Sequence, residues 1–446
     1  MTDTGRFRLP HPLILLLVGV LVAAALTWIL PAGEYARRTD PATNRSVVVA
    51  GTYHAVPRAP VGPFAAVVSV PRGFADAADV IAVVLLVGGA WVVVDRLGTL
   101  ARLVAALVSV FKDRGLIAIP VISVVFATMG ALENMQEEII PLVPVLLVLG
   151  RGLGIDAVSV VAMSAGAAMI GSAFGPTNPF QAGIAMKLAQ LPAGSAAPLR
   201  FAMFGIALVL WVAWTMRYAS RTRTAMVTAG DTPTTRVSTK DVLIMLLVVS
   251  PMAAYVYGSI ALGWGFNELS AGFFIAGMIA GLWGGLGLEG TTLAYLEGMQ
   301  SLLPAAMLVG VARSISVVLT DGHVIDTILQ GLAAPLGHTT PAAAAMLMIP
   351  AQALVHVVVP SVSGQAVLTM PVFVPLSDLL GVPRHVTVLA YQMGAGLCEL
   401  LTPTNGALMA VLLAAGVPYQ RWVRFAVVGV GIVLVVGVAG MIVGGR

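Results

Sequence analysis

The chain has 446 residues, of which 59% are hydrophobic and only 10% are charged, with a formal net charge of +4. This composition excludes a soluble globular protein, because so few polar residues could not cover so much apolar surface. The single cysteine, Cys398, excludes an internal disulfide framework, and basic loops at a membrane explain the positive charge better than nucleic-acid binding does.

Apolar runs near the ~20-residue length of a membrane-spanning helix recur along the chain, so the sequence predicts an all-α polytopic membrane protein. The first run follows Arg6 and Arg8 and is expected to be an anchor helix with a cytoplasmic N-terminus. Two runs are too long for a straight crossing and contain Pro-Thr-Asn near their centres, which predicts broken helices. The predicted crossings are 12–30, 80–95, 155–190 (broken), 200–218, 241–260, 269–287, 303–320, 384–416 (broken) and 422–443.

Two other apolar regions, 116–150 and 341–380, each break at a polar centre. A re-entrant hairpin, which enters and leaves the membrane on the same side, would explain both. We expect the hairpin tips near Asn134–Glu138 and Ser361–Gln365. Irregular backbone at membrane depth is tolerated only where it is buried in protein or lines a watery cavity, so both tips are candidates for a binding site.

The second half of the chain repeats the first at an offset of 227 residues. Pro144 then meets Pro371, Gly154 meets Gly381, and the Pro-Thr-Asn of residues 176–178 meets that of residues 403–405. The first half, residues 1–218, contains the anchor helix, the first hairpin (116–150) and the first broken helix (155–190). The second half, residues 241–446, contains scaffold helices over 241–287, then the second hairpin (341–380) and the second broken helix (384–416). A cytoplasmic linker, 219–240, joins them. With this topology most Lys and Arg residues face the cytoplasm and the two halves are inverted, as in many secondary transporters.

Long motifs resemble one known family. They include MQEEIIPLVPV at 135–145, GVARSISVVLTDGHVIDTIL at 310–329 and VPSVSGQAVLTMPVFVPLSDLLG at 359–381. These motifs are similar to YfcC-like carriers of the anaerobic four-carbon-dicarboxylate (DcuC-type) family, in the ion transporter superfamily. The resemblance covers nearly the whole chain. It implies an inner-membrane secondary carrier with two re-entrant hairpins, often a homodimer, that moves carboxylate metabolites or amino acids; some relatives are labelled basic amino acid antiporters.

The two Pro-Thr-Asn breaks are candidate binding elements. A proline inside a helix frees a carbonyl, and the half-helix after the break points a partial positive charge at the centre. Thr177, Asn178, Thr404 and Asn405 could thus bind a substrate carboxylate, with Asn178 and Asn405 also near a coupling ion; the alternative is a plain kink. At the second tip, Ser361, Ser363, Gly364 and Gln365 let the backbone approach a ligand closely, unless they only form a polar turn.

Glu137 and Glu138 occupy the matching tip of the first hairpin, one turn after Glu133. A charge at the bilayer centre costs roughly 2.5–3.5 kcal/mol on insertion scales, so such groups are paired, protonated or facing water. We expect one of the adjacent pair to face the site and to bind a substrate ammonium, a cation or a proton. The alternative is that they cap the second limb of the hairpin, and Glu133 is expected to be structural.

Arg313 is predicted to lie within a crossing, where its planar guanidinium would match a substrate carboxylate. The alternative, which does not exclude the first, is an internal salt bridge to Glu137, Glu138 or Glu399. Glu399 precedes the second break and is expected to carry a coupling proton, or else to pair with Arg313. His356 is expected to be structural.

These features favour a secondary transporter, ion-coupled or exchanging, for a small carboxylate-bearing metabolite, foremost an amino acid, which could be basic. A four-carbon dicarboxylate is the alternative substrate. It ranks second because Glu137 and Glu138 would repel it unless they are protonated or neutralised. A channel or an intramembrane enzyme is more distant. The sequence has no Walker phosphate loop and no metal-ligand spacing, so we expect no enzymatic activity and no cofactor beyond a coupling Na⁺ or H⁺. The expected partners are the substrate, membrane lipid and a second copy of the chain.

Overall fold

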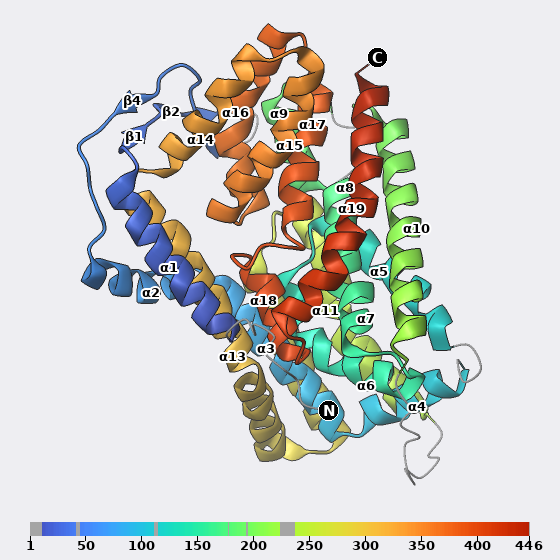
Figure 1. Ribbon diagram of the computed structural model, residues 1–446. Coiled ribbons are helices and arrows are strands. Elements are labelled where there is room, and N and C mark those ends of the chain that lie inside the picture. Colours follow the sequence, from blue (N-terminus) through green and yellow to red (C-terminus); the bar gives the residue numbers. More distant parts are fainter. Residues whose placement is uncertain are drawn as a thin grey trace, which may run out of the picture.

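The protein is an integral membrane protein built almost entirely of helices (Figure 1). The computed structural model describes residues 11–41, 45–110, 115–176, 178–192, 195–223 and 237–445. In the first half the helices are α1 (Pro12–Ile29), α2 (Pro63–Asp76), α3 (Ala78–Arg96), α4 (Thr99–Val110), α5 (Ala118–Glu133), α6 (Val143–Leu153), α7 (Ala157–Val161), α8 (Ala167–Phe174), α9 (Ile184–Leu188) and α10 (Ala197–Arg221). In the second half they are α11 (Thr239–Ala261), α12 (Phe266–Gly284), α13 (Gly287–Asp321), α14 (Ile325–Ala333), α15 (Pro341–Val358), α16 (Val362–Leu380), α17 (Arg384–Tyr391), α18 (Gly406–Ala414) and α19 (Tyr419–Gly444).

Among the described residues, nine helices are long and apolar enough to cross a membrane. They include α3, α10, α12, α13 and α19, which occupy five of the predicted crossings, and also the limbs α15 and α16 of the second predicted hairpin. The predicted crossings 12–30 and 241–260 are the helices α1 and α11. The predicted linker 219–240 lies mostly outside the described residues.

Residues 32–79, which lie between the first two predicted crossings, contain strands and a helix that no local pattern in the sequence indicates. Strand β1 (Gly33–Glu34) pairs with β4 (His54–Ala55), and β2 (Arg37–Asp40) pairs with β3 (Arg45–Val48), both antiparallel. Helix α2 follows, and its small residues pack on α13. These elements form because their buried residues cover neighbouring helices: β3, for example, packs on α16. Local sequence patterns do not reveal such a partner.

Both predicted hairpins are present as pairs of helices whose outer ends meet. In the first, α5 ends at Glu133 and its C-cap is Asn134, which has the left-handed φ of 61°; a 3₁₀ turn over Glu137–Leu142 then leads back into α6. Gly115, before α5, lies against Leu153 at the end of α6, so the chain returns to its starting side. In the second hairpin, α15 and α16 are joined by a short turn. Figure 1 shows α15 and α16 at the top and α6 at the bottom of the molecule.

Both predicted broken helices are also present. The first consists of α7, a π-helical turn, α8, a break and then α9; the second consists of α17, a π-helical turn, an unwound segment and α18. Asn178 and Asn405 cap the half-helices after the breaks, because their Oδ1 atoms accept backbone N–H groups of Phe180 and Leu408, respectively. The prolines of both motifs prevent the helices from continuing.

The element order of the two halves agrees with the predicted repeat. Gly154 and Gly381, which meet at the offset of 227 residues, both have φ of 70° and each ends the second limb of a hairpin. Glycine adopts this left-handed conformation without the steric cost that a side chain adds. The inverted orientation of the two halves in the membrane stays a prediction.

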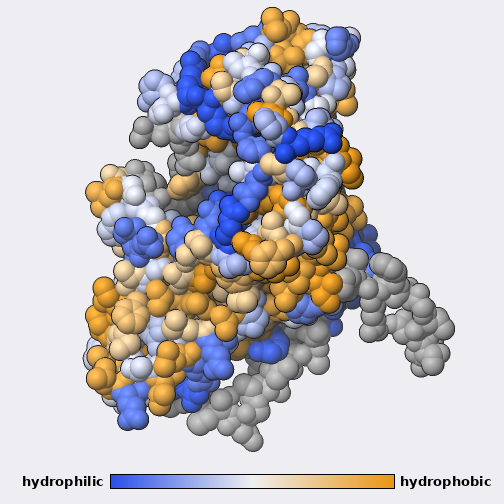
Figure 2. All heavy atoms as spheres, turned by 90° about the vertical axis from the view of Figure 1, so that its left-hand side faces the viewer, coloured by the Kyte–Doolittle hydropathy of each residue, from blue (hydrophilic) through white to orange (hydrophobic). Residues whose placement is uncertain are grey.

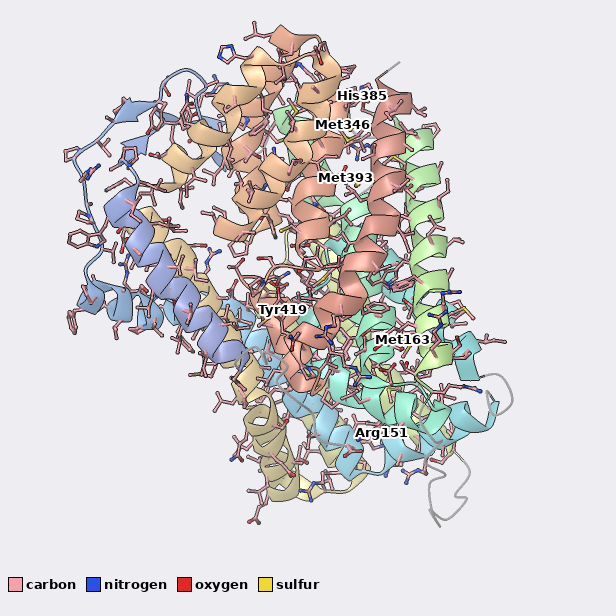
Figure 3. All side chains as sticks on the ribbon, in the orientation of Figure 1. Arg151, Met163, Met346, His385, Met393 and Tyr419 are labelled. Atoms are coloured by element: carbon pink, nitrogen blue, oxygen red, sulfur yellow. The ribbon has the colours of Figure 1, made fainter. Side chains whose placement is uncertain are left out.

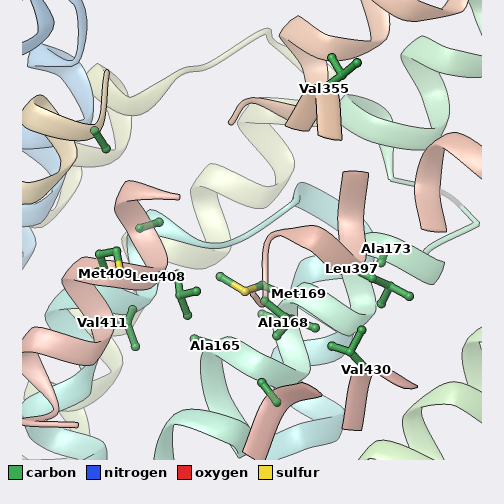
Figure 4. Packing of buried hydrophobic residues seen from close by; sticks show 14 of the residues in the cluster. Ala165, Ala168, Met169, Ala173, Val355, Leu397, Leu408, Met409, Val411 and Val430 are labelled. Carbon is green, nitrogen blue, oxygen red and sulfur yellow. The ribbon is translucent and has the colours of Figure 1, made fainter. Parts of the chain in front are cut away.

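The helices pack in two groups. Helices α1, α2, α3, α11, α12 and α13 pack on one another, whereas the hairpins, the broken helices, α10 and α19 form the second group. Figure 4 shows the core of the second group, in which Met169 of α8 and Leu408 of α18 are buried with Val430 of α19. At its upper end His385 lies beside the last turn of α19 (Figure 3), with its Nε2 2.7 Å from the carbonyl oxygen of Gly444.

Candidate functional site

A cavity of about 490 Å³ lies where the two helix groups meet. Its volume falls in the range of sites that enclose small molecules, about 300–1,000 Å³. Both hairpin tips and the second break contribute to its walls, together with α2, α3 and α13. Eight of the residues predicted for the site line this one cavity: Glu137, Glu138, Arg313, Ser361, Ser363, Glu399, Thr404 and Asn405.

A second, larger cavity of about 860 Å³ adjoins the first. Asp76, Arg313 and Ser361 line both, and Gly364 lines only the larger one. Charged side chains of the strand segment and α2 also line the larger cavity, Arg37 and Arg72 among them. Figure 2 shows the side of the molecule that carries these elements, with hydrophilic residues in a band across it. The larger cavity therefore forms a polar vestibule to the central one.

Gln136 joins the first hairpin tip to the second break. Its Nε2 donates to Glu399 Oε2 at 2.6 Å, and its Oε1 accepts from Asn405 Nδ2 at 3.4 Å. The Asn405 Nδ2 also donates to the backbone oxygen of Glu399 at 3.3 Å, which holds the unwound segment against the cap. One amide side chain thus connects an element of each half of the chain at the wall of the cavity.

Asn178 performs the corresponding connection within the first half. Its side chain is fully buried, and its Nδ2 donates to Asn134 Oδ1 at 3.2 Å and to Ser172 Oγ at 3.1 Å. Asn178 does not line the central cavity, so the structure places it as the cap that holds the first tip on the first break. Its predicted partner in that motif, Thr177, lies outside the described residues.

The two adjacent glutamates of the first tip differ in their surroundings. Glu138 is 3% exposed, and its Oε2 accepts the backbone N–H of Gln136 at 3.0 Å. Glu137, in the same 3₁₀ turn, is half-buried. Both side chains line the cavity, but that of Glu138 also accepts the backbone hydrogen bond from Gln136 within the tip. Glu133 ends α5, and its side chain is outside the described set.

Arg313 of α13 forms an ion pair with Asp76 of α2 through its Nε. This pair differs from the predicted partners Glu137, Glu138 and Glu399, because α2 was not anticipated. Both side chains are partly exposed, at 42% and 49%, so the guanidinium remains accessible from both cavities. A planar guanidinium has five N–H donors, and a pairing through Nε leaves others available to a ligand carboxylate.

The second hairpin tip holds a buried hydrogen-bond chain. Ser361 Oγ caps α16 by accepting the Gly364 N–H at 3.3 Å. Gln365 is fully buried and lies outside the lining of both cavities, where it contacts His356 and Gln352 instead of a ligand space. His356 in turn has its Nε2 3.9 Å from Glu399 Oε1.

The cavity wall includes residues that were not singled out from the sequence, among them the polar residues Asp76, Asp79 and Gln136. Gln136 falls within the predicted tip Asn134–Glu138, so its place there was the only signal. Asp76 and Asp79 flank the start of α3, and their carboxylates carried no periodic pattern or motif. Only the packing of α2 on α13 and of α3 on the first tip brings them to the cavity.

Comparison with known proteins agrees with this architecture. Residues 9–445 match the family model described as C4-dicarboxylate anaerobic carrier, DcuC. The chain belongs to the DcuC family. It is 28% identical, over 97% of its length and 95% of the relative, to a putative basic amino acid antiporter, YfcC, of Escherichia coli. It is 25% identical, over 97% of its length and 96% of the relative, to an uncharacterized protein of Haemophilus influenzae.

Among solved structures, the YdaH transporter of Alcanivorax borkumensis is similar over 98% of both chains, with 17% identity and a TM-score of 0.46. Family membership and the apolar helices together make this DcuC-family protein a membrane transporter. The geometry of its central cavity provides the basis for a more specific function.

Proposed function

We propose that this DcuC-family transporter is a secondary carrier of an amino acid with a cationic side chain across the inner membrane. The observation that supports the proposal is the charge of the central cavity. Among the described residues that line it, one is basic, Arg313, and five are acidic: Asp76, Asp79, Glu137, Glu138 and Glu399.

This balance of charge disfavours a dicarboxylate substrate. In a partly dehydrated cavity, like charges repel strongly, because the effective dielectric constant is lower than in water. A basic amino acid brings two cationic groups and one carboxylate. The acidic wall suits its ammonium and side chain, and Arg313 suits its carboxylate. The name of the E. coli relative, a putative basic amino acid antiporter, agrees with this assignment.

Transport would move the group of hairpins and broken helices relative to α1, α2, α3, α11, α12 and α13. The polar cavity at their junction then opens to alternate sides of the membrane. We further propose that the N-terminus is cytoplasmic and that the carrier is a homodimer, as the family resemblance implies. Exchange, or coupling to Na⁺ or H⁺, would drive accumulation.

Uptake into proteoliposomes tests the proposal. We expect labelled arginine or lysine to enter liposomes that contain the protein, and labelled succinate or fumarate not to enter. Unlabelled arginine loaded inside should accelerate the entry of labelled arginine, because a carrier returns faster when it is occupied, whereas a channel shows no such stimulation. Succinate uptake without arginine uptake would favour the dicarboxylate assignment and overturn the proposal.

A further inference from the structure

His356 and Glu399 face each other behind the wall of the central cavity. His356 lies near the end of α15 and is fully buried, and Glu399 lies in the unwound segment before the second break, 3% exposed. Their nearest polar atoms are His356 Nε2 and Glu399 Oε1, 3.9 Å apart. We infer that these two side chains together form a proton-binding site, and that its proton is the coupling ion of the carrier. The inference rests on the proposed function.

The hydrogen bonds of Gln365 determine which nitrogen of His356 carries a hydrogen. Gln365 Nε2 lies 2.8 Å from the backbone oxygen of Gln352. A carbonyl oxygen only accepts, so the atom facing it must be the amide nitrogen, and the other atom must be the oxygen. That oxygen, Oε1, lies 2.9 Å from His356 Nδ1. Nδ1 is therefore the donor, and in the neutral imidazole Nε2 carries only a lone pair.

The polar atom 3.9 Å from His356 Nε2 is itself an acceptor, Glu399 Oε1. Nε2 is buried and has no hydrogen-bond partner among the described residues. The second oxygen of Glu399, Oε2, is engaged by Gln136, which leaves Oε1 toward the ring. A lone pair and a carboxylate oxygen repel each other, and one added proton on either atom lets the two side chains move from 3.9 Å to hydrogen-bond distance. No bond between heavy atoms changes, and water in the cavity supplies and receives the proton, since Glu399 lines it.

A proton fits this gap better than an alkali cation does. Hard cations are held by several oxygen ligands, whereas one of the two atoms that face this gap is an imidazole nitrogen. Glu399 belongs to a larger electrostatic environment, in which a cationic substrate would offset the carboxylate charges and favour release of the proton. The other titratable or charged groups around the pair are Asp76, Asp79, Glu137, Glu138 and Arg313 in the cavity wall, and the neighbouring Cys398, whose Sγ contacts α15.

The site also connects both hairpin tips. Glu399 is bound to the first tip through Gln136, and His356 is bound to the second hairpin through Gln365. Adding or removing one proton therefore changes the charge at a point that both hairpins contact. Exchange of the proton for a cationic amino acid follows, because both compete for the same negative charge.

Infrared spectroscopy tests the site without any substrate. The full-length protein in liposomes is measured as a function of pH, and the C=O band of a protonated carboxyl group is followed. We expect a titrating band that is lost in Glu399→Gln and whose midpoint moves by about one pH unit or more in His356→Gln, because the proton loses its second acceptor. A band that persists in Glu399→Gln, or a midpoint unmoved in His356→Gln, would overturn the proposal.

Two matched variants serve as controls. Glu297 is exposed and paired with Arg96, and His385 contacts the end of α19, so Glu297→Gln and His385→Gln should leave the band unchanged. If Glu399→Gln does not fold, His356→Gln alone decides the result.

Transport in proteoliposomes tests the coupling. In the wild type a pH gradient should drive arginine accumulation. Glu399→Gln should reduce this accumulation at least tenfold, and the arginine uptake that remains should no longer depend on the pH gradient. Equal gradient-driven accumulation in the variant would contradict a coupling role. If the wild type moves no arginine, the proposed substrate fails, whereas the infrared result still decides whether the proton site exists.

Discussion

Two neighbouring side chains of the same type have different roles at the first hairpin tip. The backbone N–H of Gln136 binds Glu138, and Glu137 lies half-buried at the cavity. The 3₁₀ turn makes this difference, because successive side chains on a helical turn point in different directions. Both side chains line the cavity, and we propose that Glu137 is the one of the pair that binds the ligand.

We predict that Glu137→Gln raises the apparent KM for arginine at least ~30-fold, which corresponds to about 2 kcal/mol of lost attraction in a partly dehydrated site. Glu138→Gln should instead lower the stability by ~0.5–2 kcal/mol, the usual value of such a capping bond, with KM changed less than about threefold. Uptake kinetics and thermal unfolding of both variants measure these effects. The reverse assignment of the two effects would contradict our placement of the glutamates.

Arg313 is predicted to recognise the carboxylate of the substrate. Arg313→Gln should weaken the binding of arginine at least ~30-fold, which corresponds to about 2 kcal/mol for a charge-assisted hydrogen bond. Agmatine lacks the carboxylate, so its inhibition constant should change less than about threefold. Competition against labelled arginine measures both. The double variant Arg313→Gln with Asp76→Asn is the control: if it restores arginine binding, Arg313 serves only to neutralise Asp76.

The second limb of each hairpin ends at a glycine with a left-handed backbone conformation. Gly154 and Gly381 both have φ of 70°, and the chain turns there into a broken helix. The two turns thus set the angle between a hairpin and the break that completes the site. A non-glycine residue pays a conformational cost at such a position even where space is available.

We predict that Gly154→Ala and Gly381→Ala each lower the free energy of unfolding by ~1–2 kcal/mol. Thermal unfolding in detergent measures this. Gly331→Ala is the matched control, because Gly331 lies exposed within α14, where an added Cβ meets no atom within 4 Å. Alanine there should leave stability unchanged or raise it. Equal effects at all three positions would mean that the left-handed turns are not required.

The whole molecule consists of two helix groups that meet at a charged cavity. Helix α13 contacts α18 of the second break, and α3 contacts the 3₁₀ turn of the first tip, so the second break and the first tip lie against the opposite group. A movement of one group past the other would change the walls of the cavity. This arrangement suits alternating access around one site.

The predicted inversion of the two halves can be tested by labelling. With Cys398→Ala as background, Arg151→Cys and His338→Cys place single thiols at exposed positions near the outer ends of the two hairpins. Figure 3 shows Arg151 at the bottom of the molecule. A membrane-impermeant maleimide should label His338→Cys in intact cells and Arg151→Cys only after permeabilisation. Labelling of both from one side would exclude the inverted topology.

The sequence by itself determined the membrane class, the family, the hairpins and the two breaks. These features have local causes: apolar run length, proline, left-handed glycine and the polar residues of the tips act within a few residues of themselves. For the same reason the sequence indicated eight residues of the cavity wall, including Glu137, Thr404 and Asn405.

Only the tertiary structure decided which of these residues contact each other. The pairing of Arg313 with Asp76, the bridge from Gln136 to Glu399 and the contact of His356 with Gln365 join elements distant in sequence or turned toward one another by packing. The strands of residues 33–55 and helix α2 likewise exist because α13, α14 and α16 provide the surfaces they cover. Such contacts depend on how helices are placed in space, and no pattern within one segment records that placement.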